Sequence, residues 1–452
     1  MAITHDLTVG NETRAMLKLA FPMMMGNLIQ QLYNVADTII VGRFIGSHAL
    51  AAVGSAFSVM VLLNSIILGF CMGSGTVFSV LFGAKEINQL KNSFFVSFCL
   101  IGTLALVIQF LALFFIDKIL LFIRIPVEVW ADTKTYLQII FYGILFTSAY
   151  NYFAAIMRSM GNTMIPLLFL AASAIINIVL DIVFIVPFNM GVGGAAYATI
   201  IAQGISAISL TVYCMKKIPI LRLERKHLQF DTDIVKKIGN HSILTSIQQS
   251  VMNLGILMIQ GLVNSFGVSA MAAFAAVVKI ESFAYLPEQE FGNAFSTFIA
   301  QNYGAKEQGR IRNGIRSAIK VITIYGIAVS ALIILFAKPL MRIFISPNET
   351  EILQIGMQYL FIVASFYCFI GYLFMFYGLY RGIGKPEVSI LLTVISLGTR
   401  VVLAYTLSSV PSIGMGGIWW AIPIGWALAD LTGFYKMRTI DKLKEPKPAP
   451  ET

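Results

Sequence analysis

The stretch Gln30-Gln-Leu-Tyr-Asn-Val-Ala-Asp-Thr-Ile-Ile-Val-Gly42 closes a long apolar run that begins at Ala15. Such a run is long enough to cross a bilayer, which takes about 20 apolar residues in a helix. It nevertheless contains an acid, Asp37. A charged side chain at the centre of a membrane helix costs about 3 kcal/mol on insertion scales, and the acids that persist there are usually functional. The first question is therefore which residues accompany Asp37.

The composition is that of a membrane protein with many spans. Of the 452 residues, 58% are hydrophobic and only 12% are charged, whereas soluble proteins carry about 25% charged residues. The apolar segments show helical periodicity or none, so the short alternating strands of an outer-membrane barrel are not indicated. Because helices satisfy their own backbone groups in lipid, we predict an all-α integral membrane protein. Its twelve transmembrane helices are expected at roughly 15–41, 49–80, 93–116, 132–157, 163–187, 191–214, 241–264, 270–301, 314–337, 351–380, 387–409 and 414–436.

The basic residues predict the orientation of these helices. With twelve spans, both termini lie on one side, and most of the 32 lysines and arginines fall in the loops of that side. Cytoplasmic loops carry such an excess, so both termini are expected in the cytoplasm. This placement in loops explains the net charge of +10 without a nucleic-acid partner. The expected surroundings are the lipid bilayer.

The two halves of the chain repeat each other. Gly83-Ala-Lys-Glu86 recurs as Gly304-Ala-Lys-Glu307, and Arg158-Ser-Met-Gly161 recurs as Arg381-Gly-Ile-Gly384. Six spans is an even number, so the halves share one orientation and should be related by a pseudo-two-fold axis along the membrane normal. We predict a six-helix N-lobe at residues 1–215 and a six-helix C-lobe at residues 241–436. A cytoplasmic linker is expected at 216–240 and a disordered cytoplasmic tail at 437–452.

A second acid matches Asp37 in depth. Asn177 and Asp181 are four residues apart in the fifth segment and so share one helix face. Counted from the outer ends of their helices, Asp37 and Asp181 reach a similar level, and Thr199 of the sixth segment reaches it too. This set could bind Na⁺ through oxygen ligands, or exchange protons at two acids in an apolar pocket. Alternatively, each acid pairs with a structural partner such as Arg43.

The C-terminal half lacks this acidic pair. Arg400 occupies the position equivalent to Asn177, and the charges of this half lie mainly on the eighth segment, at Lys279, Glu281, Glu288 and Glu290. Lys279, Glu281 and Arg400 could form a buried ionic network, which would either hold helices together or bind a substrate or a second proton. Aromatic residues such as Tyr33 and Tyr285 suit a cavity for flat cations.

No motif in the sequence points to an enzyme. There is no phosphate-binding loop of the Walker type and no HExxH zinc motif. The four cysteines are scattered singly and show no metal-ligand spacing. We therefore expect no enzymatic activity, no cofactor and no metal, other than a coupling ion that could be Na⁺.

Taken together, the motifs resemble those of the multidrug and toxic compound extrusion (MATE) family of prokaryotic efflux transporters. The resemblance covers nearly the whole chain and rests on the twelve spans in two repeats. Its motifs are Pro22 in the first helix, Asn34-Val-Ala-Asp-Thr-Ile-Ile-Val-Gly42, Arg158-Ser-Met-Gly-Asn162, Asn177-Ile-Val-Leu-Asp181 and Gln301-Asn-Tyr-Gly-Ala-Lys306.

The resemblance implies a V-shaped pair of bundles that exports organic cations in exchange for H⁺ or Na⁺. It also implies that the first helix bends at Pro22. The acid that some branches of the family carry in the seventh helix is absent from residues 241–264. The N-lobe cation site implied by the resemblance consists of Asp37, Asn151, Asn177, Asp181 and Thr199.

The expected function is a monomeric secondary antiporter in the bacterial cytoplasmic (inner) membrane, acting on small, cationic, amphipathic molecules. One alternative is a lipid-linked oligosaccharide flippase of the same superfamily, which would need a basic cavity. Only Arg400 and Lys279 are candidates for lining it. A channel or a structural membrane protein is the third possibility. The sequence leaves open whether H⁺ or Na⁺ is the coupling ion.

Overall fold

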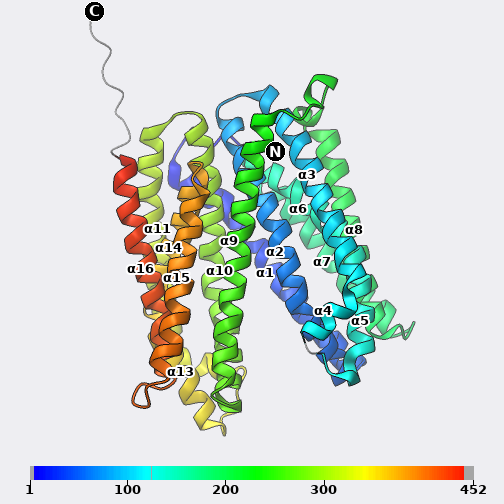
Figure 1. Cartoon of the computed structure of the whole chain (residues 1–452), viewed down its shortest axis with the longest axis vertical. Coiled ribbons are helices and arrows are strands. Elements are labelled where there is room, and N and C mark those ends of the chain that lie inside the picture. Colours follow the sequence, from blue (N-terminus) through cyan, green and yellow to red (C-terminus); the bar gives the residue numbers. More distant parts are fainter. Residues whose placement is uncertain (1–4, 124, 442–452) are drawn as a thin grey trace, which may run out of the picture. The chain divides into compact units, whose positions relative to one another are not determined.

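The computed structural model describes residues 5–123 and 125–441, and this part of the chain contains helices and no strands (Figure 1). The predicted tail at 437–452 is only partly described. Its first residues, 437–441, form the end of the last helix, and 442–452 lie outside the described residues.

Twelve long helical segments match the twelve predicted ones. Ten of them are single helices, and two are interrupted near the middle. Most ends lie within about six residues of the predicted limits, whereas α9 begins nine residues earlier than predicted. The segments are α1 (Glu12–Phe44), α2 (Ser47–Gly83), α3 (Ile87–Phe114), α5 (Val127–Tyr142) with α6 (Ile144–Ser159), α7 (Met164–Ile185), α8 (Gly191–Lys217), α9 (Thr232–Asn264), α10 (Val268–Gly304), α11 (Gln308–Leu335), α13 (Thr350–Ala364) with α14 (Tyr367–Gly382), α15 (Pro386–Ser408) and α16 (Gly416–Asp441). Two short helices, α4 (Ile116–Phe122) and α12 (Ala337–Arg342), complete the α-helices of the described residues.

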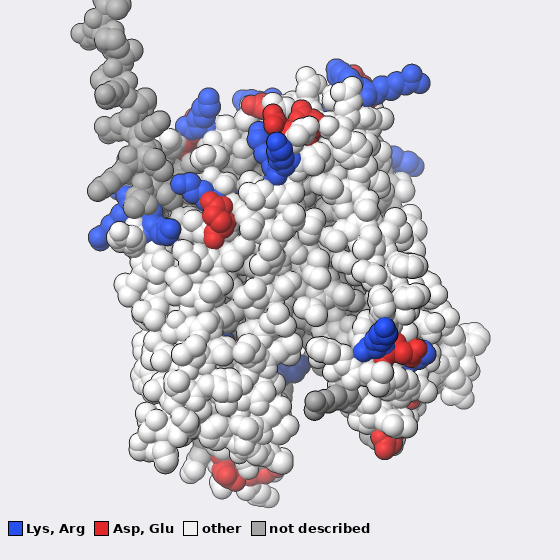
Figure 2. All heavy atoms as spheres, in the orientation of Figure 1, with Lys and Arg blue, Asp and Glu red and all other residues white. Residues whose placement is uncertain are grey.

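Length and hydropathy fit these segments to a membrane. Eight of the described helices are long and apolar enough to cross it, and the pairs α5–α6 and α13–α14, bent by 45° and 53°, bring the number to ten. The remaining two, α1 and α16, have 33 and 26 residues but are less apolar. On the face shown in Figure 2, charged side chains gather near the helix ends and the surface between them is almost uncharged. The all-α membrane architecture is thus confirmed.

The chain divides into two compact units. Unit 1 comprises 1–253, 294–314 and 381–386, and unit 2 comprises 254–293, 315–380 and 387–452. Each unit takes most of its residues from one half of the chain, as the repeat suggests. The long helices α9 and α10 contribute residues to both units. The lobe boundaries stated from the sequence stay a prediction.

Within unit 1, small residues bring α2 and α9 together. A Cβ atom on Gly69 or Gly73 would overlap the backbone of α9 at Ser246 or Ser242. The Ser242 hydroxyl donates to the Phe70 carbonyl oxygen at 3.0 Å, and Ser246 donates to that of Ile66 at 3.1 Å. Close backbone approach with serine hydrogen bonds is typical of helix pairs in membranes.

The repeated Gly-Ala-Lys-Glu block has the same local structure in both copies. Gly83 lies against the Gln301 carbonyl of α10, and Gly304 lies against the Val80 carbonyl of α2, so neither position leaves room for a Cβ atom. Lys85 and Lys306 have left-handed backbone angles, with φ of 59° and 61°. The two copies therefore form one reciprocal contact between the ends of α2 and α10.

The connection between α8 and α9 is shorter than the predicted linker and is folded. It runs from residue 218 to 231 and contains two 3₁₀ turns, η1 (Pro219–Leu221) and η2 (Arg225–His227). The Asn92 side chain of α3 donates to the carbonyl oxygens of His227 and Gln229, at 3.1 and 2.8 Å. These bonds hold the connection against α3.

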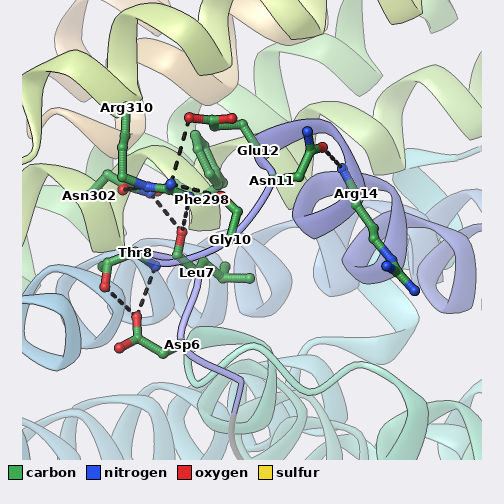
Figure 3. Close-up of polar contacts among 10 residues, drawn as sticks. All are labelled: Asp6, Leu7, Thr8, Gly10, Asn11, Glu12, Arg14, Phe298, Asn302 and Arg310. Atoms are coloured by element: carbon green, nitrogen blue, oxygen red, sulfur yellow. Dashed lines mark hydrogen bonds and ion pairs between the residues drawn. The ribbon is translucent and has the colours of Figure 1, made fainter.

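The N-terminal segment, residues 5–11, lies along the end of α10 (Figure 3). The Leu7 N–H donates to Gln301 Oε1 at 2.9 Å, and Asn302 Nδ2 donates to the Leu7 carbonyl oxygen at 3.2 Å. Arg310 of α11 donates to the carbonyl oxygens of Gly10 and Leu7. These residues all belong to unit 1.

Candidate functional site

Helices α1 and α7 of unit 1 position the two acids of the candidate site. They pack closely because Gly26 of α1 leaves room for Leu167 and Leu170 of α7. Asp37 on α1 is 8% exposed and Asp181 on α7 is fully buried. Two carboxyl groups thus lie in the apolar interior of one bundle.

The Asn177 amide connects Asp181 to α8. With its orientation assigned from the hydrogen-bond network, Asn177 Nδ2 donates to Asp181 Oδ2 at 3.1 Å, and Oδ1 accepts from the Thr199 N–H at 3.2 Å. In this orientation, the Thr199 hydroxyl is 3.4 Å from the same amide oxygen of Asn177. The predicted i, i+4 pair and Thr199 are therefore in contact.

Asp37 joins this group through electrostatics rather than through a hydrogen bond. It is close enough to Asp181 for the two carboxyl charges to interact. One oxygen of each, Oδ1 of Asp37 and Oδ1 of Asp181, is buried and has no hydrogen-bond partner among the described residues. Two ionised acids cannot share an apolar site at low cost unless a cation or a proton neutralises them.

The surroundings fit a cation site. The ion pairs recorded for the described residues do not include Asp37, so the suggested structural pairing with Arg43 is not seen. In the described ranges, no three or more His, Cys, Asp or Glu side chains are grouped so that they could hold a metal ion. The donors on offer are carboxylate, amide and hydroxyl oxygens, which suit H⁺ or a hard ion such as Na⁺.

Two tyrosines belong to the same group. Tyr33 of α1, which was predicted to line a substrate cavity, interacts electrostatically with both Asp37 and Asp181, and so does Tyr136 of α5. Tyr33 precedes Asp37 by four residues, so helical spacing alone could have placed it on the same face. Tyr136 was missed because nothing local in the sequence relates α5 to α1.

Two further residues predicted to matter in this half of the chain are Asn151 and Pro22. The Asn151 side-chain nitrogen donates to the Thr147 carbonyl oxygen of its own helix, α6, at 2.9 Å, and its place in the cation site stays a prediction. Pro22 is buried inside α1, where it leaves the Lys18 carbonyl without its usual partner. One residue along, the Leu19 carbonyl accepts from the Thr163 hydroxyl at 2.9 Å. The proline region of α1 is thus held by the start of α7.

The charged residues of unit 2 are arranged differently from the predicted network. The Tyr359 hydroxyl donates to Glu281 Oε2 at 2.6 Å, and Arg400 interacts electrostatically with Glu281. Lys279 is exposed, so its predicted place in a buried network with these two residues is wrong. Glu290 is half-buried. The Tyr285 ring stacks with that of Phe374 at 6.4 Å between centroids.

Known proteins share this sequence pattern and fold. The model of the MatE family matches residues 22–183 and 242–406. The probable multidrug resistance protein YpnP of Bacillus subtilis is 29% identical over 437 residues, with 96% of each chain covered. The multidrug export protein MepA of Staphylococcus saprophyticus is 24% identical over 441 residues, with 95% of each covered.

Solved structures agree with the sequence relatives. The outward-facing conformation of a multidrug resistance MATE family transporter of the MOP superfamily matches with a TM-score of 0.91 and 26% identity, covering 98% of each chain. A MATE protein in the straight conformation matches with a TM-score of 0.90 and 26% identity, covering 98% of this chain and 99% of the other. The family match covers more than half of the chain and includes both Asp37 and Asp181. This chain therefore belongs to the MatE family of multi-pass membrane transporters, which are not enzymes.

Proposed function

We propose that the protein is a secondary antiporter that exports small organic cations across the bacterial cytoplasmic membrane in exchange for H⁺ or Na⁺. Both termini then lie in the cytoplasm and the monomer is the working unit. The observation that carries this proposal is the pair Asp37 and Asp181. They lie on two packed helices, interact with each other, and each has a buried oxygen without a partner among the described residues.

The coupling ion acts by neutralising this pair. Without it, repulsion between the carboxylates favours separation of α1 from α7, and a bound proton or Na⁺ removes the repulsion. The move involves α1 near Pro22, where the backbone lacks one helical hydrogen bond. An ion that binds one arrangement of α1 better than the other shifts the population toward it, and this shift expels the substrate.

The substrate class is supported by the relatives and by unit 2. Both relatives named above are called multidrug proteins. Unit 2 carries Glu281 and Glu290, which are partly exposed, and the stacked Tyr285 ring. Acids and aromatic faces attract flat organic cations.

Transport by purified protein in proteoliposomes tests the proposal. The wild-type protein should accumulate ethidium when an H⁺ or a Na⁺ gradient is imposed, and the gradient that drives uptake identifies the coupling ion. Asp37→Asn and Asp181→Asn should abolish this uptake while the protein remains monodisperse. Asp233→Asn, at an exposed residue of α9, is the matched control and should transport normally.

Three results would overturn the proposal. If both carboxamide variants drive uptake like the wild type, the coupling site is elsewhere. If neither gradient drives ethidium uptake but the protein moves a lipid-linked oligosaccharide between leaflets, the protein is a flippase. Uptake without any dependence on a gradient would indicate a channel.

A further inference from the structure

A second buried carboxyl, Glu288, lies in the middle of α10 within unit 2 and takes no part in the site at Asp37 and Asp181. It is 3% exposed. Neither Oε1 nor Oε2 has a hydrogen-bond partner in the described part of the chain. None of the ion pairs recorded there involves Glu288. Among the acids of unit 2, it contrasts with Glu281, whose carboxylate accepts from Tyr359.

The space around this carboxyl group is created by a glycine. A Cβ atom on Gly371 of α14 would lie 2.9 Å from Glu288 Oε1 and 2.5 Å from a methyl carbon of Ile322 on α11. Any larger residue at 371 would therefore press on both side chains. The Glu288 carboxyl is thus enclosed by α10, α11 and α14.

The titratable groups that face Glu288 are neutral or acidic. They are Tyr325 on α11, Tyr367 and Cys368 on α14, and, two turns away on its own helix, Glu281. The Tyr367 hydroxyl is itself buried without a partner among the described residues, and it interacts electrostatically with both Glu281 and Glu288. Tyr325 donates to the Ala284 carbonyl, one turn from Glu288.

This environment cannot hold a carboxylate ion at low cost. A buried charge without a counter-ion or a donor costs several kcal/mol, whereas a neutral carboxylic acid avoids most of that cost. Among the described residues, no hydrogen-bonded amide accompanies it as Asn177 accompanies Asp181. The geometry favours a proton over a metal ion.

We propose that Glu288 is a proton-binding site of unit 2, occupied in this conformation and emptied when a substrate binds. On release, the Glu288 carboxylic acid gives its proton to the solution and becomes a carboxylate. This inference goes beyond the proposed function, which places the coupling ion in unit 1 alone.

Infrared spectroscopy and proton release together test the site. The C=O stretching band of a protonated carboxylic acid should be present in the wild-type protein at neutral pH and weaker in Glu288→Gln. On binding of tetraphenylphosphonium in weakly buffered solution with a pH-indicator dye, Glu288→Gln should release one proton fewer per protein than the wild type. Glu387→Gln, at an exposed acid of α15, should match the wild type in both measurements.

Further variants make the outcome decisive. Tyr367→Phe should keep both the infrared band and the number of protons released, because the Tyr367 hydroxyl forms no hydrogen bond with Glu288 among the described residues. The proposal is overturned if Glu288→Gln leaves the band unchanged, or if it removes the band without changing the number of protons released. Asp181→Asn separates the two sites. If proton release is lost in Asp181→Asn but not in Glu288→Gln, the Glu288 site is ruled out. If it is lost in Glu288→Gln but not in Asp181→Asn, the coupling site of unit 1 is ruled out.

Discussion

The guanidinium of Arg310 donates to the carbonyl oxygen of Gly10 at 2.8 Å, across 300 residues of sequence. The same group donates to the Leu7 carbonyl at 3.2 Å and to Asn302 Oδ1 at 3.1 Å, and it lies 3.6 Å from Glu12 (Figure 3). Each nitrogen of the planar guanidinium group thus has an acceptor. One side chain of α11 fixes the segment that leads into α1.

Removing the Arg310 guanidinium should loosen the N-terminal segment. We expect Arg310→Ala to lower the stability of the protein by about 2 kcal/mol, since the side chain is largely buried and its hydrogen bonds involve a charged donor. Arg310→Lys should recover only part of the loss, because an ammonium group cannot reproduce the planar guanidinium. The readouts are the melting temperature in detergent and the rate of proteolysis within residues 5–11. Arg312→Ala, at an exposed residue of the same helix, should leave both unchanged.

The reciprocal contact between Gly83 and Gly304 predicts two severe substitutions. Gly83→Ala and Gly304→Ala should each cost about 3 kcal/mol or more, because the added methyl group meets a backbone carbonyl that cannot move aside alone. The matched control is Gly102→Ala in α3, where nothing lies within 4 Å of the added carbon, and there a gain of about 0.5–1 kcal/mol is expected. Thermal unfolding of the purified variants measures all three. Equal stability of the three variants would contradict the close approach of α2 and α10.

Much of this arrangement could be predicted from local sequence. The twelve helices follow from apolar length, because a membrane helix needs a fixed number of residues. The contact between Asn177 and Asp181 follows from the spacing of four on one helix, and the equivalence of Gly83 and Gly304 follows from the repeated block. In each case a short pattern determines which residues share a face or a turn.

What could not be predicted depends on contacts between distant segments. Tyr136 reaches the acids from α5, and Glu288 owes its enclosure to a glycine on α14. Neither contact is marked by a regular spacing of residues in the sequence. The exposure of Lys279 is a similar case, since the position of a charge in an apolar run does not indicate whether its side chain is buried in the folded protein.

The Asn177 amide and the Thr199 hydroxyl should contribute unequally to coupling. Asn177→Leu removes the donor to Asp181 and also the acceptor for the Thr199 N–H. A hydrogen bond to a charged group is worth about 1.5–3 kcal/mol, so gradient-driven ethidium uptake should fall by about 10- to 100-fold. Thr199→Val keeps the backbone N–H and removes only the hydroxyl at 3.4 Å, so its loss should be below about tenfold. A larger defect in Thr199→Val than in Asn177→Leu would rule out this assignment of the amide.

The connection between α8 and α9 should respond to acid through His227. Its Nδ1 accepts from the Glu224 N–H at 3.0 Å, which leaves Nε2 to donate to Asn88 Oδ1 at 3.2 Å. The ring is therefore neutral when the connection is docked. Burial and then the positive charge of Lys91 lower the pKa of His227 below its usual value. Protonation would also break the bond from Glu224.

The sign of the effect follows from this lowered pKa. The undocked connection binds a proton more readily than the docked one, so docking is fully stable above the ordinary histidine pKa of about 6.5 and weakens as the pH falls below it. Hydrogen exchange of residues 218–231, corrected for the intrinsic pH dependence, should be faster at a pH of about 5.5 than at about 7.5. His227→Gln cannot titrate and should show no such difference between the two conditions. If the variant and the wild type respond alike, a group other than His227 controls the docking of this connection on α3.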